Sequence, residues 1–371
     1  MDNRSSLALK IGRIAALFLI IYFFLLSIGL LSGSFKLFGK EFAEGLVELA
    51  SNPMVGLLAG ILATTLVQSS STTTSMIVGL VGAGTLNLEI AIPMVMGANI
   101  GTTVTNTIVS VGHITRGEEF KRAFAASTVH DVFNVLAVIV FLPLQIATGF
   151  LSKASAYLAD VFQSAGGLEF ASPLKTITKP VVKSFLGWLD GTGLVSPDAL
   201  PWVGSAIAIA VMLLALRQLV KLRRLVILGR VEQFFQRYLF GNPLYALILG
   251  TFLTVLVQSS SITTSIIIPL VGAGILSVAQ VFPYTLGANI GTTTTALLAS
   301  LVTGNPVAVA VAFSHLIFNL CGMALFWPLA RIPLAIADRL SRVAVKSKFA
   351  PFLYILIVFY ALPGALIFLM R

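Results

Sequence analysis

The sequence predicts an all-α membrane protein, from its composition, the length of its apolar runs and an internal duplication. The 371 residues are 57% hydrophobic and 10% charged, against about 25% charged residues in an ordinary soluble domain. Several apolar runs approach or exceed the roughly 18 to 20 residues that cross a bilayer as a helix, without the short alternation of barrel strands. The net charge of +10 comes from basic residues between these runs, which indicates membrane topology rather than nucleic-acid binding.

The duplication organises the chain. Residues 52–112 align with residues 242–302 at a constant offset of 190, with 31 identities in 61 positions. The alignment pairs two QSSS segments and two GANIGTT segments, and after a five-residue shift it pairs His130 with His315. Each copy has three full spans, an odd number, so the second copy should run through the membrane in the opposite direction. The prediction is an inverted-topology repeat.

The predicted elements follow in order. In the first copy, residues 1–148, they are a span, a hairpin and two further spans, at 12–31, 53–82, 88–111 and 122–148. An outer connecting segment is expected at 149–200. In the second copy, residues 201–330, the same kinds of element are expected at 202–220, 243–272, 278–302 and 306–330. Residues 331–371 are predicted to form a basic inner loop and a C-terminal transmembrane helix.

The two hairpins are predicted to be re-entrant. Pro53 to Val67 is 15 residues, or about 22 Å as a helix, which is too short to cross a bilayer. The part after the QSSS segment is shorter still. Two half-length helices meeting at a polar turn enter and leave on one side, and irregular backbone is tolerated at that depth only inside protein or beside water. The spans that contain GANIGTT are expected to be interrupted helices.

The charge distribution predicts a cytoplasmic N-terminus. With the N-terminus inside, 17 of the 24 Lys and Arg residues fall in inner segments and seven in outer segments. Inner loops of membrane proteins are enriched in basic residues, so this bias favours the N-inside orientation.

The serines of the QSSS segments are candidate anion ligands. They stand where the second half-helix of each hairpin begins, and a helix start offers free backbone N–H groups and the positive end of the helix dipole. Two helix starts related by inversion would face one midplane oxyanion site. The alternative is that they are N-caps only. The candidates are Ser69, Ser70, Ser71, Ser259, Ser260 and Ser261.

Neutral oxygen atoms near these serines are candidate cation ligands, because amide and hydroxyl oxygens suit hard cations. No Lys or Arg lies in either motif, so a bound polyanion needs co-bound cations, and each ligand then raises the affinity of the other. The candidates are Gln68, Thr102, Thr105, Gln258, Thr292 and Thr295. Asp131, which aligns with Leu316, is predicted to seat one extra cation, with an ion pair to Arg122 as the alternative.

The other residues of these motifs are given supporting roles. GANIG also matches GxxxG, which packs membrane helices without any ligand, and the histidines are predicted to hydrogen-bond between helices rather than to bind a ligand. The supporting set is Asn99, Asn289, Gly97, Gly101, Gly287, Gly291, His130 and His315. The P-loop lysine, HExxH and GxSxG are all missing from the sequence, so no enzyme is predicted.

The two QSSS segments, the two GANIGTT segments and KRAFAASTVHDVFN at 121–134 resemble the type II sodium/phosphate cotransporter family, in its bacterial branch. The resemblance covers about residues 10–148 and 202–330. It implies sodium-driven import of inorganic phosphate across the plasma membrane, the inner membrane of a bacterium, with co-transported Na+ and no other cofactor. It also implies phosphate and sodium contacts for the six serines and Thr72. One sodium site is implied for Gln258, Ser259, Thr292, Thr295 and Thr102.

Asp131 stands where the resemblance implies electrogenic transport of divalent phosphate with an additional sodium ion. Ile262 replaces the counterpart of Thr72, so the two halves are not expected to contribute equally. Symport of another oxyanion, phosphate export on the same core, and a structural or signalling membrane protein remain alternatives. The expected partners are phosphate, sodium ions and membrane lipid, with no nucleic acid, and the sequence leaves the oligomeric state open.

Overall fold

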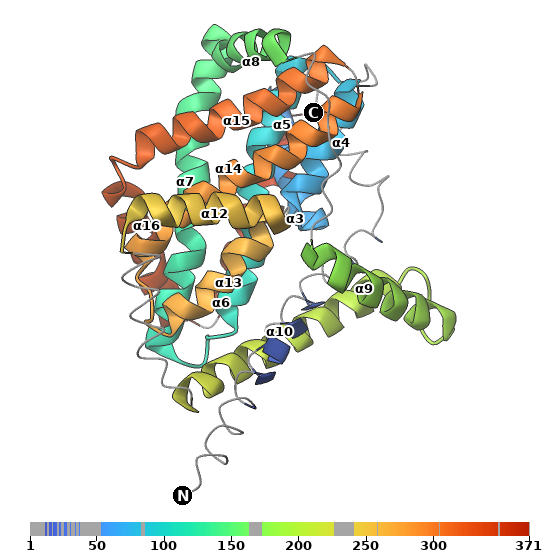
Figure 1. The fold of residues 1–371 in the computed structure, drawn as a ribbon, viewed down its shortest axis with the longest axis vertical. Coiled ribbons are helices and arrows are strands. Elements are labelled where there is room, and N and C mark those ends of the chain that lie inside the picture. Colours follow the sequence, from blue (N-terminus) through green and yellow to red (C-terminus); the bar gives the residue numbers. More distant parts are fainter. Residues whose placement is uncertain are drawn as a thin grey trace, which may run out of the picture.

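The computed structural model describes residues 53–82, 86–162, 173–225, 241–257, 259–303, 305–347 and 349–370, together with scattered residues between 12 and 37. Every regular element in these ranges is a helix (Figure 1), which confirms the all-α prediction. Nine of the 20 residues of the predicted span at 12–31 lie outside the described residues, and the described ones are helical. Gln258 also lies outside the described residues.

The first copy contains five described helices from residue 53 onward. They are α3 (Pro53–Val67), α4 (Ser70–Gly82), α5 (Leu88–Gly101), α6 (Val104–Val111) and α7 (Gly117–Thr148). The side chain of Asn87 starts α5 as an N-cap, because its Oδ1 accepts from the Ile90 N–H at 3.0 Å. The predicted span 88–111 is interrupted at Thr102 and Thr103, between α5 and α6. Helix α7 begins five residues before the predicted start at 122.

The segment predicted as a connection contains two helices, α8 (Phe150–Phe162) and α9 (Pro173–Gly191), and α10 (Leu200–Leu225) follows. Gly149 adopts φ 65° at the end of α7, a left-handed conformation that glycine allows and that commonly ends a helix. The chain turns there, so that α8 packs against α15 at the top of Figure 1.

The second copy repeats the hairpin boundaries. Its helices are α12 (Pro243–Val257), α13 (Ser260–Gly272), α14 (Val278–Thr303) and α15 (Pro306–Phe326). The bounds of α12 and α13 equal those of α3 and α4 shifted by 190 residues. Helix α14 is continuous, unlike the prediction of an interrupted span. In the first copy the break is stabilised, because the carbonyl of Thr102 accepts from the Ser261 hydroxyl at 3.4 Å.

The chain ends with α16 (Arg331–Lys346) and a C-terminal helix built from α17 (Ala350–Ile355), the π-helix η2 (Leu356–Ala361) and α18 (Leu362–Leu369). Residues 331–346 are helical where a loop was predicted. The reason is a buried stripe on one side of α16, facing α7, formed by Pro333, Ala337, Ser341 and Ala344. Its basic residues lie on the exposed side.

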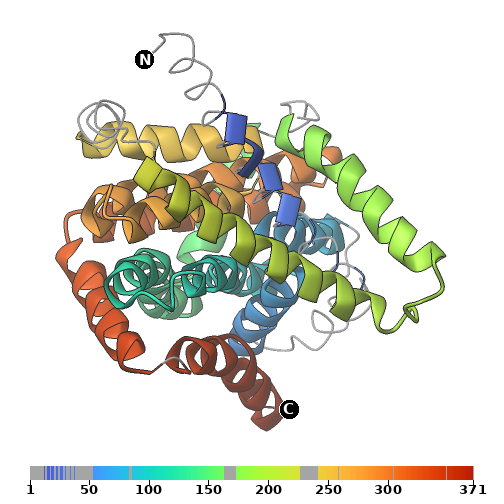
Figure 2. The same ribbon diagram turned by 90° about the horizontal axis from the view of Figure 1, so that it is seen from below.

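Four helices in the described part of the chain are long and apolar enough to cross a membrane, by length and composition. They are Leu88–Val111, Gly117–Thr148, Pro306–Phe326 and Ala350–Leu369. The helices α3, α12 and α13 are apolar but have only 13 to 15 residues, which is short of a full crossing. Figure 2 shows the dark red C-terminal helix beside the blue helix α3, against which η2 and α18 pack.

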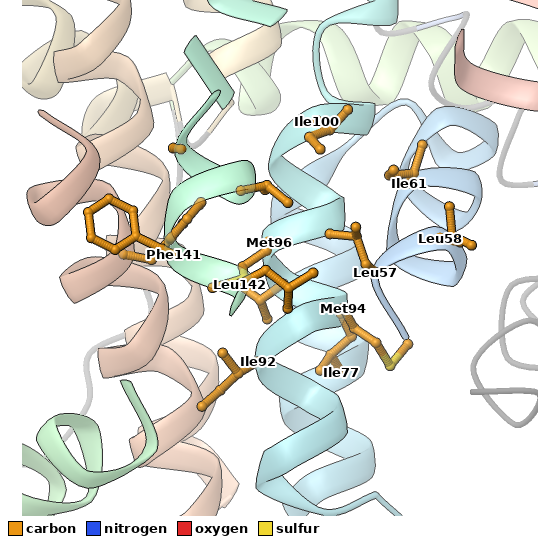
Figure 3. Packing of buried hydrophobic residues seen from close by; sticks show 14 of the residues in the cluster. Leu57, Leu58, Ile61, Ile77, Ile92, Met94, Met96, Ile100, Phe141 and Leu142 are labelled. Atoms are coloured by element: carbon orange, nitrogen blue, oxygen red, sulfur yellow. The ribbon is translucent and has the colours of Figure 1, made fainter. Parts of the chain in front are cut away.

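The core is built on two helix pairs, α3 with α5 and α12 with α14. Figure 3 shows Leu57 and Met94 at the first of these contacts, with Phe141 and Leu142 of α7 on the other side of α5. A Cβ atom added at Gly97 would overlap the carbonyl oxygen of Leu57, and one added at Gly287 would overlap that of Leu247. The glycines of both GANIGTT segments therefore lie at helix–helix contacts.

Candidate functional site

The first QSSS segment begins with a strained residue. Gln68 has φ 56°, the one positive φ of a non-glycine residue in the described ranges, and such a conformation costs about 1 to 3 kcal/mol. Two side-chain hydrogen bonds hold it. Its Nε2 donates to the Thr65 carbonyl at 3.0 Å, and its Oε1 accepts from the Thr105 hydroxyl. The structure thus brings together Gln68 and Thr105, two of the predicted sodium ligands.

The first serine of each motif is an N-cap. Ser69 Oγ accepts from the Thr72 N–H at 3.2 Å and lies 2.9 Å from the Thr72 hydroxyl. Ser259 has an extended backbone and its Oγ accepts from the Ile262 N–H at 3.4 Å. The capping interpretation therefore applies to these two serines. It does not account for the next two serines of each motif, which lie buried in the first turn of α4 and of α13.

Several hydroxyl groups around the two motifs are buried and have no hydrogen-bond partner among the described residues. Leaving a buried polar group unpaired costs about 1 to 3 kcal/mol, and such groups are uncommon. Their concentration near the hairpin turns favours a polar ligand there. The set comprises Thr64, Thr65, Thr73 and Thr74 in the first hairpin, Thr254 in the second, and Thr295 in α14. Thr295 is also a predicted sodium ligand.

The other predicted sodium ligands of the GANIGTT segments keep free oxygen lone pairs. The Thr102 hydroxyl donates to the Ala98 carbonyl at 2.8 Å, and the Thr292 hydroxyl donates to the Ala288 carbonyl at 3.0 Å. Each donor is satisfied within its own helix, so each oxygen can still coordinate a cation. No group of three or more His, Cys, Asp or Glu that could hold a metal ion occurs in the described ranges. The two threonines offer neutral oxygens, a ligand type that suits a hard cation.

The two copies exchange hydrogen bonds through histidine and asparagine. His130 Nε2 lies 2.6 Å from Asn289 Oδ1, and His315 Nε2 lies 2.8 Å from Asn99 Oδ1. In both cases a histidine of one copy contacts the asparagine of the GANIGTT segment of the other copy. Reciprocal contacts of this kind are those expected across a two-fold axis.

Further amides complete this network and fix its donors. Asn289 Nδ2 donates to Asn134 Oδ1 at 2.8 Å, and Asn134 Nδ2 donates to the Asn99 carbonyl at 2.9 Å. Asn99 Nδ2 donates to Asn319 Oδ1 at 2.9 Å. The amide nitrogens of Asn99 and Asn289 are thus engaged, so their oxygens accept and Nε2 of each histidine carries the hydrogen.

Asn106 was not singled out from the sequence. Its Oδ1 accepts from the hydroxyls of Thr264 and Ser265 at 3.0 and 3.1 Å, and its Nδ2 lies 3.5 Å from His130 Nδ1. It links α13 of the second hairpin to the histidine network. The counterpart of Asn106 in the second copy is Ala296, so comparing the two copies position by position would have found it.

Asp131 is buried, with an exposed fraction of 1%. Its Oδ2 accepts from the Tyr354 hydroxyl at 3.0 Å, and its Oδ1 is buried with no partner in the described part of the chain. The alternative of an ion pair with Arg122 is wrong. The guanidinium of Arg122 instead donates to the Gly272 carbonyl, with Nε at 3.1 Å and Nη2 at 2.9 Å.

Comparisons with known proteins agree with the motifs. The family model described as Na+/Pi-cotransporter matches residues 23–169 and 207–336. The sodium-dependent phosphate transport protein 2A of Rattus norvegicus is 34% identical, over 96% of this chain and 67% of its own length. The sodium-dependent phosphate transport protein 2B of Homo sapiens is 32% identical, over 95% of this chain and 64% of its own length.

The chain spans about two thirds of the length of these relatives. No solved structure matches it. The extent of the family match and the level of identity to the relatives nevertheless decide its membership. The chain belongs to the Na+/Pi-cotransporter family, and it is a multi-pass membrane transporter rather than an enzyme.

Proposed function

We propose that the chain is a sodium-coupled symporter that imports inorganic phosphate by alternating access. The observation that carries this proposal is the pair of buried helix starts at Ser70 and Ser260, which lie among hydroxyl groups and follow a segment without Lys or Arg. A helix N-terminus favours an anion through its free N–H groups and its dipole. The printed names of the relatives, sodium-dependent phosphate transport proteins, favour phosphate among the oxyanions.

Sodium ions supply the positive charge that the site lacks. Gln68 and Thr105 are in contact, Thr295 has a buried hydroxyl without a partner, and Thr102 and Thr292 keep free lone pairs. Such neutral oxygens suit a hard cation. Because the cation then forms part of the anion's environment, each ligand increases the affinity for the other, which is the thermodynamic basis of symport.

The two copies form an inverted repeat with two re-entrant hairpins. Support comes from the equal bounds of the hairpin helices at an offset of 190, and from the packing of α4 against α14 and of α13 against α6 and α7. The reciprocal pairs His130 with Asn289 and His315 with Asn99 agree with a two-fold relation. The N-terminus is cytoplasmic, and the protein lies in the plasma membrane.

Asp131 makes the transport electrogenic. A buried carboxylate with one unpaired oxygen is costly in a membrane interior unless a cation or a proton compensates its charge. An extra sodium ion at Oδ1 would compensate this charge and add one positive charge to each cycle with divalent phosphate. Leu316 occupies the corresponding position in the second copy, so the site exists once in the chain.

Uptake into proteoliposomes tests the proposal. Phosphate should accumulate only when a sodium gradient is directed inward, and the double substitution Ser70→Ala and Ser260→Ala should lower the uptake rate at least about tenfold, because it removes one buried hydroxyl from each helix start. The matched control is Ser314→Ala with Ser341→Ala, two buried serines whose hydroxyls donate within their own helices.

Each outcome decides between the candidates. Uptake that does not depend on the sodium gradient would refute symport. Faster uptake of sulfate than of phosphate would indicate that another oxyanion is the substrate. Unchanged uptake in the Ser70→Ala, Ser260→Ala protein would indicate that these serines only pack.

A further inference from the structure

The hydrogen bond from Tyr354 to Asp131 joins two parts of the chain that lie 223 residues apart. Tyr354 belongs to α17, in the C-terminal helix outside both sequence copies. The family model ends its match at residue 336, so this tyrosine lies beyond the residues that identify the family. The hydroxyl reaches the one carboxylate that the proposed function uses.

The ring of Tyr354 is fixed by two aromatic neighbours. Phe124 of α7 meets it edge to face with ring centroids 5.9 Å apart, and Phe359 meets it in the same way at 5.9 Å. Phe359 is fully buried and follows Tyr354 by five residues. It belongs to the π-helix η2, which begins two residues after Tyr354. The aromatic contacts thus hold the hydroxyl in position for Asp131.

The helix that carries Tyr354 also contacts the first hairpin and the interrupted span. Helix α17 packs against α6, while η2 and α18 pack against α3. Asp131 therefore accepts a hydrogen bond from the C-terminal helix, which also packs against α3, the helix that ends at Val67 just before Gln68. Because its other oxygen, Oδ1, has no partner among the residues that the structure describes, the carboxylate keeps one oxygen available for a cation.

We infer that Tyr354 is a positioning residue for the charge of Asp131, and this inference rests on the proposed function. Its hydroxyl donates a charge-assisted hydrogen bond to Oδ2, which stabilises the ionised carboxylate and sets its orientation. Oδ1 then remains the oxygen that binds the additional sodium ion. Without the hydroxyl, the carboxylate loses the one hydrogen-bond donor that the described residues give it, so its orientation toward a sodium ion at Oδ1 is no longer fixed.

The test is Tyr354→Phe, which removes the hydroxyl and keeps the ring that packs against Phe124 and Phe359. We expect the sodium concentration for half-maximal phosphate-evoked current to rise about tenfold, and the charge moved per phosphate to fall below the wild-type value. Both are measured in proteoliposomes from current and radiolabelled uptake. The matched control is Tyr360→Phe, a second tyrosine of the C-terminal helix, which should leave both quantities unchanged.

A double-mutant cycle tests whether Tyr354 acts through Asp131 or through a general effect on the structure. Asp131→Asn should abolish the extra charge, and adding Tyr354→Phe to it should change neither quantity further, because the partner has already been altered. Tyr354→Phe with wild-type sodium dependence and charge ratio would overturn the inference. An equal effect of Tyr354→Phe in the Asp131→Asn background would overturn it too.

Folded yield gives a second measurement. If Tyr354→Phe lowers the yield because it leaves a buried charge without its donor, Asp131→Asn should restore the yield in the double variant, and failure to do so would overturn the inference. Wild-type protein without sodium-dependent phosphate uptake would refute the proposed function itself. Normal wild-type uptake with an unaltered Tyr354→Phe variant would refute only the role of Tyr354.

Discussion

Glycine residues decide how closely the helices of the core approach. At Gly97 and Gly287 the backbone of the neighbouring helix occupies the place of a side chain, and at Gly101 an added Cβ would lie 2.6 Å from the Ile61 carbonyl oxygen. Small residues allow such contacts between membrane helices, where packing replaces the hydrophobic effect as the driving force. The glycines of the motif thus act through the contact of α5 with α3 and of α14 with α12.

We predict that Gly97→Ala destabilises the protein by about 2 kcal/mol or more, because the methyl group has no space beside the Leu57 carbonyl and α3 must shift. The apparent unfolding temperature in detergent measures this effect. Gly117→Ala is the control, since an added Cβ there meets nothing within 4 Å. Equal unfolding temperatures for the two variants would contradict the assignment of Gly97 to helix packing.

Helix α13 ends against the turn between α6 and α7. Arg122 donates two hydrogen bonds to the Gly272 carbonyl, and a cation at a helix C-terminus is favourable with the helix dipole. His113 lies in the same turn, 3.7 Å from the Glu119 carboxylate. Burial lowers the pKa of His113, and the charge of Glu119 opposes that shift.

We expect Arg122→Gln to lower the free energy of unfolding by about 1 to 2 kcal/mol, because the two hydrogen bonds from the charged guanidinium to the last carbonyl of α13 are lost. Lys121→Gln serves as the control, since it removes the same charge from the adjacent residue. Thermal unfolding in detergent compares the two variants. The cap would be refuted if Arg122→Gln unfolded at the same temperature as Lys121→Gln.

The bounds of α3 and α4 were predictable from the sequence, and the long-range partners of these helices were not. The length of the apolar run and the following QSSS segment place the end of α3 at Val67 and the start of α4 near Ser70. Helix α16 was not predicted, because its basic residues were interpreted as those of an inner loop. The buried stripe of small residues that packs against α7 is less evident in the sequence than these charges. The contact of Tyr354 with Asp131 depends on tertiary structure alone, and no local sequence pattern predicts it.

Across the whole molecule, the orientation of the two copies is testable by labelling. In a Cys321→Ala background, Ser196→Cys should react with a membrane-impermeant maleimide in intact cells, because residues 149–200 lie outside in the N-inside orientation. Ser347→Cys should react only after permeabilisation. Both serines are exposed. The reverse pattern would invert the orientation, and labelling of both from one side would contradict an odd number of crossings between them.

Helices in backbone contact cannot slide past one another. The close contacts at the glycines therefore hold α3 against α5, and α12 against α14, as two rigid helix pairs. In the proposed alternating access, relative motion would then occur at the surfaces between the copies, where α4 meets α14 and α13 meets α6. Helices α13 and α6 are joined there by hydrogen bonds between hydroxyl and amide side chains, such as the one that the Thr264 hydroxyl donates to Asn106 Oδ1. Such bonds can be exchanged one at a time for new partners, which suits the rearrangement between two states that the proposed alternating access requires.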